Sequence, residues 1–361
     1  MIKRGVNLNA DGRPIMRLSC HDLLELILTI DDRCLLIPCH IWTPHFGVYG
    51  SASGFDSLRE AFGDLESYVY GIETGISSDP EMNWLVPELE TRSILSFSDA
   101  HSAPKMGREA TIFDLENLSY GEILQAIKLP RQKEAETIAT KLDKEVGYSR
   151  LEKPEAYPPI HKKDFRFLHP TSRIIYTVEF YPEEGKYHYS GHRSCKVSFG
   201  PDEIANNGNI CPVCHHRLTE GVLCRVQQIT GRKDMSVGEK RTSKGLMWLT
   251  DPRRKHPPFV KLVPLLEIVA ESLHSTLNSQ KSLNLYNNLC LELQSELNVL
   301  LHASIGDICK VAGEEVAKAI EKVRIGKIAI KPGFDGVYGK VNVWEEEENN
   351  RSNSGQLEMG F

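Results

Sequence analysis

The sequence lacks any long apolar run. Although 40% of its 361 residues are hydrophobic, no stretch approaches the roughly eighteen consecutive apolar residues that a membrane-spanning helix needs. The first residues, MIKRGVNLNADGRP, also lack the apolar segment of a secretory signal. We therefore expect a cytoplasmic globular protein with no membrane contact, long enough for two or three domains and a sizeable core.

The chain also has little net charge, since 43 basic and 49 acidic residues leave it at −6. This balance argues weakly against a nucleic-acid partner, but the charges are unevenly spread. Residues 56–99 hold ten acidic and two basic side chains, whereas residues 225–261 hold ten basic and three acidic ones. An acidic region suits cations and a basic region suits phosphates, so an enzyme acting on nucleic acid can use both. Two unrelated solvated surfaces would give the same pattern.

Residues 1–130 alternate between helix and strand patterns. The expected elements are helices at 19–30, 55–62, 80–90 and after Ser119, and short apolar strands at 35–38, 68–73 and 93–99. Ser19 and Ser119 are the expected helix caps, each with an acidic residue three positions later. Strand, loop and helix in repetition indicate a parallel α/β layer or barrel.

The rest of the chain changes character several times. We expect a helix and linker at 131–172, a β-rich module at 173–230, a helical region with a short β unit at 231–344, and a disordered tail at 345–361. Within the fourth segment, a stretch rich in Gly, Lys and Pro precedes three helices expected at 264–278, 284–302 and 306–323.

Four potential metal ligands follow the three expected strands: His40, Glu73, Asp99 and His101. In a parallel sheet or barrel such strand ends meet at one face, and the alternation of side chains places Asp99 and His101 on the same side. Imidazole and carboxylate groups suit Zn²⁺, Mn²⁺ or Fe²⁺, and two or three such ions can clamp a phosphodiester. The pattern predicts a phosphoesterase site, although a lone histidine at a strand end is more often structural.

Four further ligands have the spacing of a zinc ribbon. His192 and Cys195 form one pair, Cys211 and Cys214 form a second pair, and fifteen residues separate the two pairs. Two such knuckles predict one structural tetrahedral Zn²⁺, whereas buried thiols would not need paired spacing. Cys224 is an alternative to His192 as the fourth ligand. A site filled by four protein ligands stabilises a fold and does not catalyse.

Three segments resemble later motifs of the polymerase-and-histidinol-phosphatase (PHP) superfamily, and among its branches they are most similar to endonuclease Q. They read IPCHIWTPHFGVYGSASGF, GIETGISSDPEMNW and FSDAHSAPKMGREATIFD. The segments around the cysteine pairs and the stretch VRIGKIAIKPGFDGVYGKV are similar to the same branch. The resemblance covers most of residues 10–128 and 176–343.

This resemblance implies a partial, distorted (β/α)₇ barrel of the PHP type, a zinc-ribbon module and a C-terminal helical region with a short β unit. It implies a metal-dependent DNA endonuclease that cuts on the 5′ side of deaminated bases, using Mg²⁺, Mn²⁺ or Zn²⁺. His40, Glu73, Asp99 and His101 take the family's ligand positions, with Asp99 and His101 catalytic. The expected contacts to DNA phosphates are Lys105 and Arg108, together with Arg253, Arg254 and Lys255 from the basic stretch.

Two departures from the family's pattern add expectations. No His-x-His pair precedes His40, so the first part of the barrel is expected to be missing, through a shortened gene product, a misplaced start or a split protein completed by a second chain. Cys39 and His45 stand where an alanine and an aromatic residue are expected, and His45 could add a ligand. Competing functions are a non-catalytic DNA-binding remnant and a phosphatase acting on a small phosphate ester.

Overall fold

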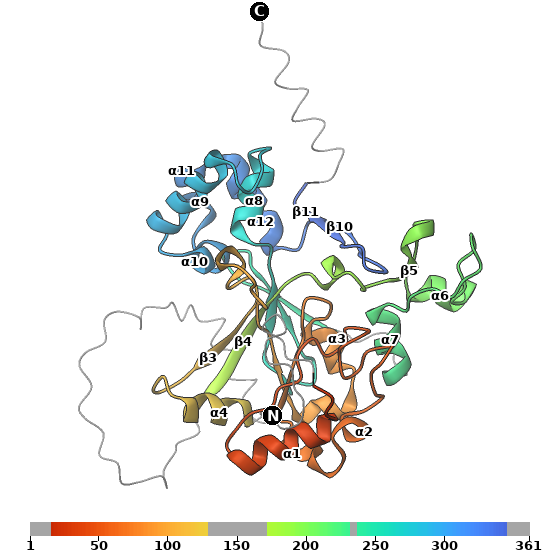
Figure 1. The fold of residues 1–361 in the computed structure, drawn as a ribbon. Coiled ribbons are helices and arrows are strands. Elements are labelled where there is room, and N and C mark those ends of the chain that lie inside the picture. Colours follow the sequence, from red (N-terminus) through yellow and green to blue (C-terminus); the bar gives the residue numbers. More distant parts are fainter. Residues whose placement is uncertain (1–15, 129–171, 232–236, 345–361) are drawn as a thin grey trace, which may run out of the picture.

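The computed structural model of the protein describes residues 16–128, 172–231 and 237–344. The helix and linker expected at 131–172, except for Ser172, and the tail expected at 345–361 lie outside these residues. The described chain is a mixed α/β structure whose helical C-terminal region packs at one end (Figure 1). None of the described helices is long and apolar enough to cross a membrane.

The N-terminal part contains short helices around two parallel strands. Its elements are α1 (Cys20–Ile30), α2 (Leu58–Phe62), the 3₁₀ helix η2 (Gly63–Tyr68), β1 (Gly71–Glu73), α3 (Pro80–Trp84), the 3₁₀ helix η3 (Pro87–Thr91), β2 (Ser93–Leu95) and α4 (Tyr120–Lys128). The Ser19 hydroxyl accepts a hydrogen bond from the Asp22 amide at 3.0 Å and starts α1, as expected. β1 and β2 pair in parallel, as the repetition predicted.

The strand expected at 35–38 is wrong, because these residues run beside β1 without forming a ladder. The Glu73 amide donates to the Pro38 carbonyl at 2.9 Å, and the Ile41 amide donates to the Glu73 carbonyl at 3.3 Å. Pro38 has no N–H to donate to a ladder, and the chain turns at His40, whose φ is +48°. In the described residues the parallel sheet therefore has two strands, not three.

A five-stranded sheet in the order β3-β4-β9-β8-β7 runs through the middle of the molecule (Figure 1). Its strands are β3 (Ala110–Asp114), β4 (Arg173–Glu179), β7 (Gly238–Arg241), β8 (Met247–Thr250) and β9 (Phe259–Lys261). β4 and β9 are parallel and the other neighbours antiparallel. The basic stretch thus supplies strands that its composition did not predict, and one layer joins segments that the predicted domain limits assign to different domains.

The region that holds the predicted zinc ligands and the C-terminal region complete the fold. Residues 182–230 form η6 (Pro182–Glu184), β5 (Ser190–His192), η7 (Arg193–Cys195), β6 (Val197–Phe199), α6 (Pro201–Asn207) and α7 (Val222–Thr230). The C-terminal elements are α8 (Leu265–Ser272), α9 (Gln280–Glu292), α10 (Glu296–Leu301), α11 (Ile305–Ala312), α12 (Glu314–Arg324), β10 (Ala329–Lys331) and β11 (Lys340–Asn342). The sequence predicted three helices here, but serine caps at Ser279, Ser295 and Ser304 and a turn at Gly313 (φ +86°) divide the region into five.

A small hydrophobic cluster gathers Leu95, Ile127 and Ile174, and the other buried apolar clusters form two larger cores. One gathers Trp248, Val260 and the apolar faces of the C-terminal helices, and the other gathers Trp42, Trp84 and the helices of the N-terminal part. Between them, Arg253 and Lys255 both form ion pairs with Glu90 of η3, and the second guanidinium nitrogen of Arg253 donates to the Trp84 carbonyl at 2.7 Å. This charged contact fastens the loop after β8 to the N-terminal part.

We therefore predict that Glu90→Gln lowers the free energy of unfolding by about 1–2 kcal/mol. It removes the anion that pairs with Lys255 and one of the two anions that pair with Arg253, which keeps Asp251. Urea denaturation at low and high salt measures the effect, which shrinks as salt rises. Glu314→Gln is the matched control, since Glu314 forms an exposed i,i+4 pair with Lys318 whose loss costs about 0.3–0.5 kcal/mol. Equal losses in both variants would contradict the prediction.

Candidate metal centres

His40 is held against the end of β1 by its own backbone. The Glu73 carboxylate accepts a hydrogen bond from the His40 amide at 2.5 Å, and the His40 carbonyl accepts one from the Thr43 amide at 2.9 Å. Gly75, at φ +65°, packs so closely that a Cβ there would lie 2.7 Å from His40 Nδ1. A glycine is therefore required at residue 75 for the imidazole to keep its place.

Asp99 and His101 lie in the segment after β2, and Asp99 contacts His40. His40 Nε2 lies 3.3 Å from Asp99 Oδ2, and His40 Nδ1 lies 4.0 Å from Glu73 Oε2. His101 Nδ1 donates to the Asp99 carbonyl at 2.8 Å, which fixes the tautomer with the lone pair on Nε2. Asp99 itself has φ +42°, a strained conformation for aspartate that turns its side chain toward His40.

The structure thus brings the four predicted ligands together as a row: Glu73, His40, Asp99 and His101. They do not form a compact cage, because in the described part of the chain only two groups of three or more ligand side chains have all their ligand atoms within 4.8 Å, and this row is not one of them. Two imidazoles and two carboxylates fit a divalent ion as donors. An ion bound by residues of this row would need further ligands to complete its coordination.

Two buried carboxylates behind the row escaped the sequence reasoning about ligands. Glu109, just before β3, is 3% exposed and Glu179, at the end of β4, is fully buried. Glu109 Oε1 accepts from the Phe180 amide at 3.4 Å and Glu179 Oε2 accepts from the Thr74 hydroxyl at 3.1 Å. The other oxygen of each carboxylate is buried without a hydrogen-bond partner in the described part of the chain, which is rare for a buried polar group.

Burial and mutual repulsion hold protons on these groups. Burial, with the negative charges of Glu73 and Asp99 nearby, raises the pKa of Glu109 to about 8. Burial and the Glu109 charge raise the pKa of Glu179 well above its usual range, and burial also raises the pKa of Glu73. The interior beside the row therefore favours positive charge, whether a proton or a metal ion.

The raised pKa of Glu109 predicts a pH dependence. Between about pH 4.5 and pH 8 the folded state binds a proton that the unfolded state has lost, so stability falls as pH rises through this window. In chelator-treated protein, Glu109→Gln should flatten this fall and raise the melting temperature at pH 8 by about 2–4 °C or more. Thermal melts at pH 5 and pH 8 measure it, with Glu315→Gln as control, since Glu315 is an exposed residue of α12. If the stability of Glu109→Gln falls between pH 5 and pH 8 as steeply as that of the parent protein, the prediction is wrong.

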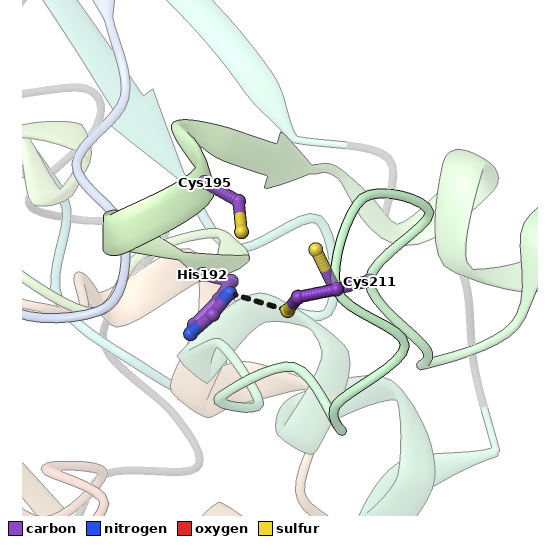
Figure 2. A group of neighbouring side chains, drawn as sticks. His192, Cys195 and Cys211 are labelled. Atoms are coloured by element: carbon purple, nitrogen blue, oxygen red, sulfur yellow. Dashed lines mark hydrogen bonds between the residues drawn. The ribbon is translucent and has the colours of Figure 1, made fainter.

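The second predicted centre is compact. The ligand atoms of His192, Cys195, Cys211 and Cys214 all lie within 4.8 Å of one another. His192, Cys195 and Cys211 point toward a common centre, and the contact between His192 Nδ1 and Cys214 Sγ is 3.2 Å (Figure 2). Although burial opposes ionisation, the backbone amides of Cys214 and Val213 lower the pKa of the Cys211 thiol to about 6. Three sulfurs, one imidazole and amides aimed at sulfur fit a tetrahedral Zn²⁺.

The alternative ligand, Cys224, lies outside this cluster. Its buried sulfur accepts a hydrogen bond from the Ser190 hydroxyl at 3.3 Å, and the same hydroxyl accepts one from the Gly221 amide. The arrangement therefore favours His192 as the fourth ligand. His45, whose role the sequence left open, stands edge-on to Tyr187 with ring centres 5.9 Å apart.

We predict that the purified protein carries about one Zn²⁺ per chain and that Cys211→Ser releases it and unfolds the module around it. Cys224→Ser is the matched control, and it should keep the metal because Cys224 is not a ligand. Elemental analysis and a colorimetric zinc-release assay measure both. Folded wild-type protein without zinc, or zinc loss in Cys224→Ser alone, would show that the ligand set is wrong.

The residues expected to contact DNA are mostly engaged within the protein. Lys105 Nζ lies 2.9 Å from Glu267, and Arg108 donates to the Ser98 carbonyl at 2.9 Å while its guanidinium lies over the Phe180 ring. Arg253 and Lys255 pair with Glu90, and Arg254 adopts φ +56° in the same loop. Their contact with DNA stays a prediction.

Comparison with known proteins identifies relatives of this chain in sequence. A family model described as the MJ0043 C-terminal domain matches residues 264–327. The chain is 26% identical over 320 residues to uncharacterized protein MJ0043 of Methanocaldococcus jannaschii, covering 85% of this chain and 32% of the relative. It is 26% identical over 309 residues to uncharacterized protein YqxK of Bacillus subtilis, covering 85% and 60%. The chain thus spans less than two thirds of both relatives.

Two solved structures are similar over nearly the whole chain. The lesion-specific endonuclease PfuEndoQ of Pyrococcus furiosus superposes with a TM-score of 0.68 at 25% identity, covering 97% of this chain and 74% of that one. Endonuclease Q bound to a 27-mer duplex with an abasic lesion gives 0.68 at 27% identity, covering 94% and 70%. The structural neighbours of the chain are therefore DNA endonucleases, as the motifs around His40 and Asp99 predicted.

Proposed function

We propose that the chain belongs to a metal-dependent DNA endonuclease like endonuclease Q, which hydrolyses the phosphodiester on the 5′ side of deaminated or damaged bases in DNA repair. The similarity to two endonuclease Q structures carries this proposal. The row of His40, Asp99 and His101 at the ends of neighbouring segments supports it, because these groups suit ions that act on phosphate esters. A phosphatase for a small ester is less favoured, since one of these neighbours is a complex with a DNA duplex.

Different residues of the chain have different roles at the proposed site. Asp99 and His101 would hold a divalent ion, with His40 beside them, and a bound ion would lower the pKa of a water and offset charge on the leaving oxygen. Glu73 positions His40 through its amide. The protons kept on Glu109 and Glu179 limit the negative charge behind the row, so a phosphodiester meets less repulsion there.

The incomplete coordination of the row also favours a second candidate. The described ligands form a line rather than a cage, so we propose that another segment or a second chain supplies further ligands. Without them, the chain would bind DNA but cut it poorly. Such a chain would act as a non-catalytic DNA-binding protein.

The test is a nicking assay on duplexes containing deoxyuridine or hypoxanthine, with Mg²⁺ or Mn²⁺. The chain joined to an N-terminal barrel segment should nick 5′ of the lesion, and the chain alone should be far weaker. In the joined protein, Asp99→Asn should lower the rate ~10²-fold or more, because it removes the anionic ligand while keeping the shape. Asp114→Asn is the control, since Asp114 pairs with Arg173 on the sheet.

The outcomes separate the candidates. DNA binding without nicking by both proteins would favour the non-catalytic candidate. Robust nicking by the chain alone would show that the row needs no added ligands. Full activity in Asp99→Asn would place the active site elsewhere.

A further inference from the structure

Two buried glutamates lie opposite each other behind the row. Glu109 precedes β3 and Glu179 ends β4, and these antiparallel strands pair with Ala110 opposite Val178. Continued by one residue, this register places Glu109 opposite Glu179, so both side chains leave the same face of the sheet, with Cβ atoms about 5 Å apart. Like charges in this position destabilise a sheet. Two carboxylates here therefore require a positive charge beside them.

The hydrogen bonds of this glutamate pair leave half of its oxygens unused. One oxygen of Glu109 accepts from the Phe180 amide, and one oxygen of Glu179 accepts from the Thr74 hydroxyl. The second oxygen of each has no partner in the described part of the chain, although the two residues are only 3% and 0% exposed. Buried polar atoms are normally bonded, so these two neighbouring oxygens indicate that a bound group lies beside them.

None of the described basic side chains bonds to the pair. Arg108, whose charge lowers the pKa of Glu109, donates to the Ser98 carbonyl instead. The charges that act most strongly on Glu179 are those of Glu109 and Asp79, and both are negative. The described residues thus supply the oxygens of a cation site without supplying its cation.

We propose that Glu109 and Glu179 bind a hard divalent cation, Mn²⁺ or Mg²⁺, in the interior behind the row. Carboxylate and hydroxyl oxygens are the ligands that such ions prefer, and the Thr74 hydroxyl adds a third oxygen to the pair. Mg²⁺ commonly keeps several water ligands, so one or two carboxylates are enough to hold it. The row combines imidazole with carboxylate and the cysteine cluster provides sulfur, so the three candidate sites differ in ligand chemistry.

A cation at the pair would also act on the row. The charges of Glu73 and Asp99 reach Glu109, so a positive charge beside Glu109 offsets them and reduces the repulsion that a phosphodiester meets there. This role rests on the proposed function, whereas the site itself does not. In metal-free protein the pair holds protons, so cation binding releases them and becomes stronger as pH rises.

Counting bound Mn²⁺ tests the pair on the full chain with Zn²⁺ in its cysteine cluster. Electron paramagnetic resonance of free Mn²⁺ at pH 8 gives the number of ions bound per chain, and Asp99→Asn serves as the background because it weakens binding at the row. In this background, Glu109→Gln and Glu179→Gln should each bind one Mn²⁺ fewer, since a single carboxylate cannot hold the ion in competition with water.

Thermal melts give a second readout and show that the variants fold. Glutamine has the shape of a protonated glutamate, so in chelator both variants should melt no lower than the Asp99→Asn background. Mn²⁺ at about a hundred times its dissociation constant should raise the melting temperature of the background by about 3 °C or more beyond its effect on Glu109→Gln or Glu179→Gln.

The matched control for both readouts is Glu122→Gln. Glu122 is also buried, but its carboxylate accepts from the Ser172 hydroxyl and the Glu116 amide. This variant should keep the Mn²⁺ count and the Mn²⁺-dependent rise in melting temperature.

Equal Mn²⁺ counts in the background and in its Glu109→Gln and Glu179→Gln variants would overturn the proposal and show that the pair holds protons only. Neither readout depends on cutting. If the nicking assay fails while the pair binds Mn²⁺, the proposed function is wrong and the cation site stands. If the joined protein nicks DNA while the counts are equal, the cation site is wrong and the endonuclease stands.

Discussion

The buried ion pair between Lys261 and Asp79 is the contact on which the candidate active site depends. Lys261 Nζ lies 2.6 Å from Asp79 Oδ2, with the two side chains 17% and 2% exposed. Asp79 also caps α3 by accepting from the Met82 amide at 3.0 Å. Lys261 ends β9, between β4 and β8 in the central sheet. The pair therefore fixes the segment after β1 to that sheet, and removing either partner would leave a buried charge at a cost of about 3–5 kcal/mol.

This fixed junction explains why so many acids share one interior. β1 carries Glu73, while β4 and the residue before β3 carry Glu179 and Glu109. Joining the two sheets places these carboxylates within reach of one another's charge, so burial and repulsion raise the pKa of each. A protein chosen for stability alone would replace such groups with apolar ones. Retaining them is characteristic of a functional site, where stability is given up for chemistry.

Local signals in the sequence predicted local structure well. Ser19 capped its helix, and the paired spacing of His192, Cys195, Cys211 and Cys214 found a cluster whose geometry the structure shows. The strand at 35–38 failed because apolar character does not reveal that Pro38 and the turn at His40 prevent a ladder. The charge pattern at 225–261 could not show which of its cations pair within the protein. Arg253 is paired with Glu90, 163 residues away in sequence, and no local pattern encodes that partner.

The sequence also offered no reason to single out the carboxylates of Glu109 and Glu179. A glutamate next to a strand is normally solvated, and only the packing of β3 against β4 buries these two. Sequence names the residue types that chemistry needs, but burial decides which of them have unusual properties. The four residues of the row were predicted as ligands because each follows an expected strand, whereas the carboxylates behind them had no such signal.

The His/Cys cluster, the candidate site for a structural Zn²⁺, also contacts a distant part of the protein. Asp335, in the turn between β10 and β11, accepts from the Arg193 amide at 2.7 Å and from the Thr219 hydroxyl at 2.5 Å. Phe334 lies so close to Gly191 that a Cβ there would be 2.5 Å from its ring. These contacts bind the C-terminal hairpin to the turns that carry His192, Cys195, Cys211 and Cys214. A metal ion held by these four ligands would therefore fix the C-terminal hairpin as well as the turns, although the ligands and the hairpin lie more than a hundred residues apart in sequence.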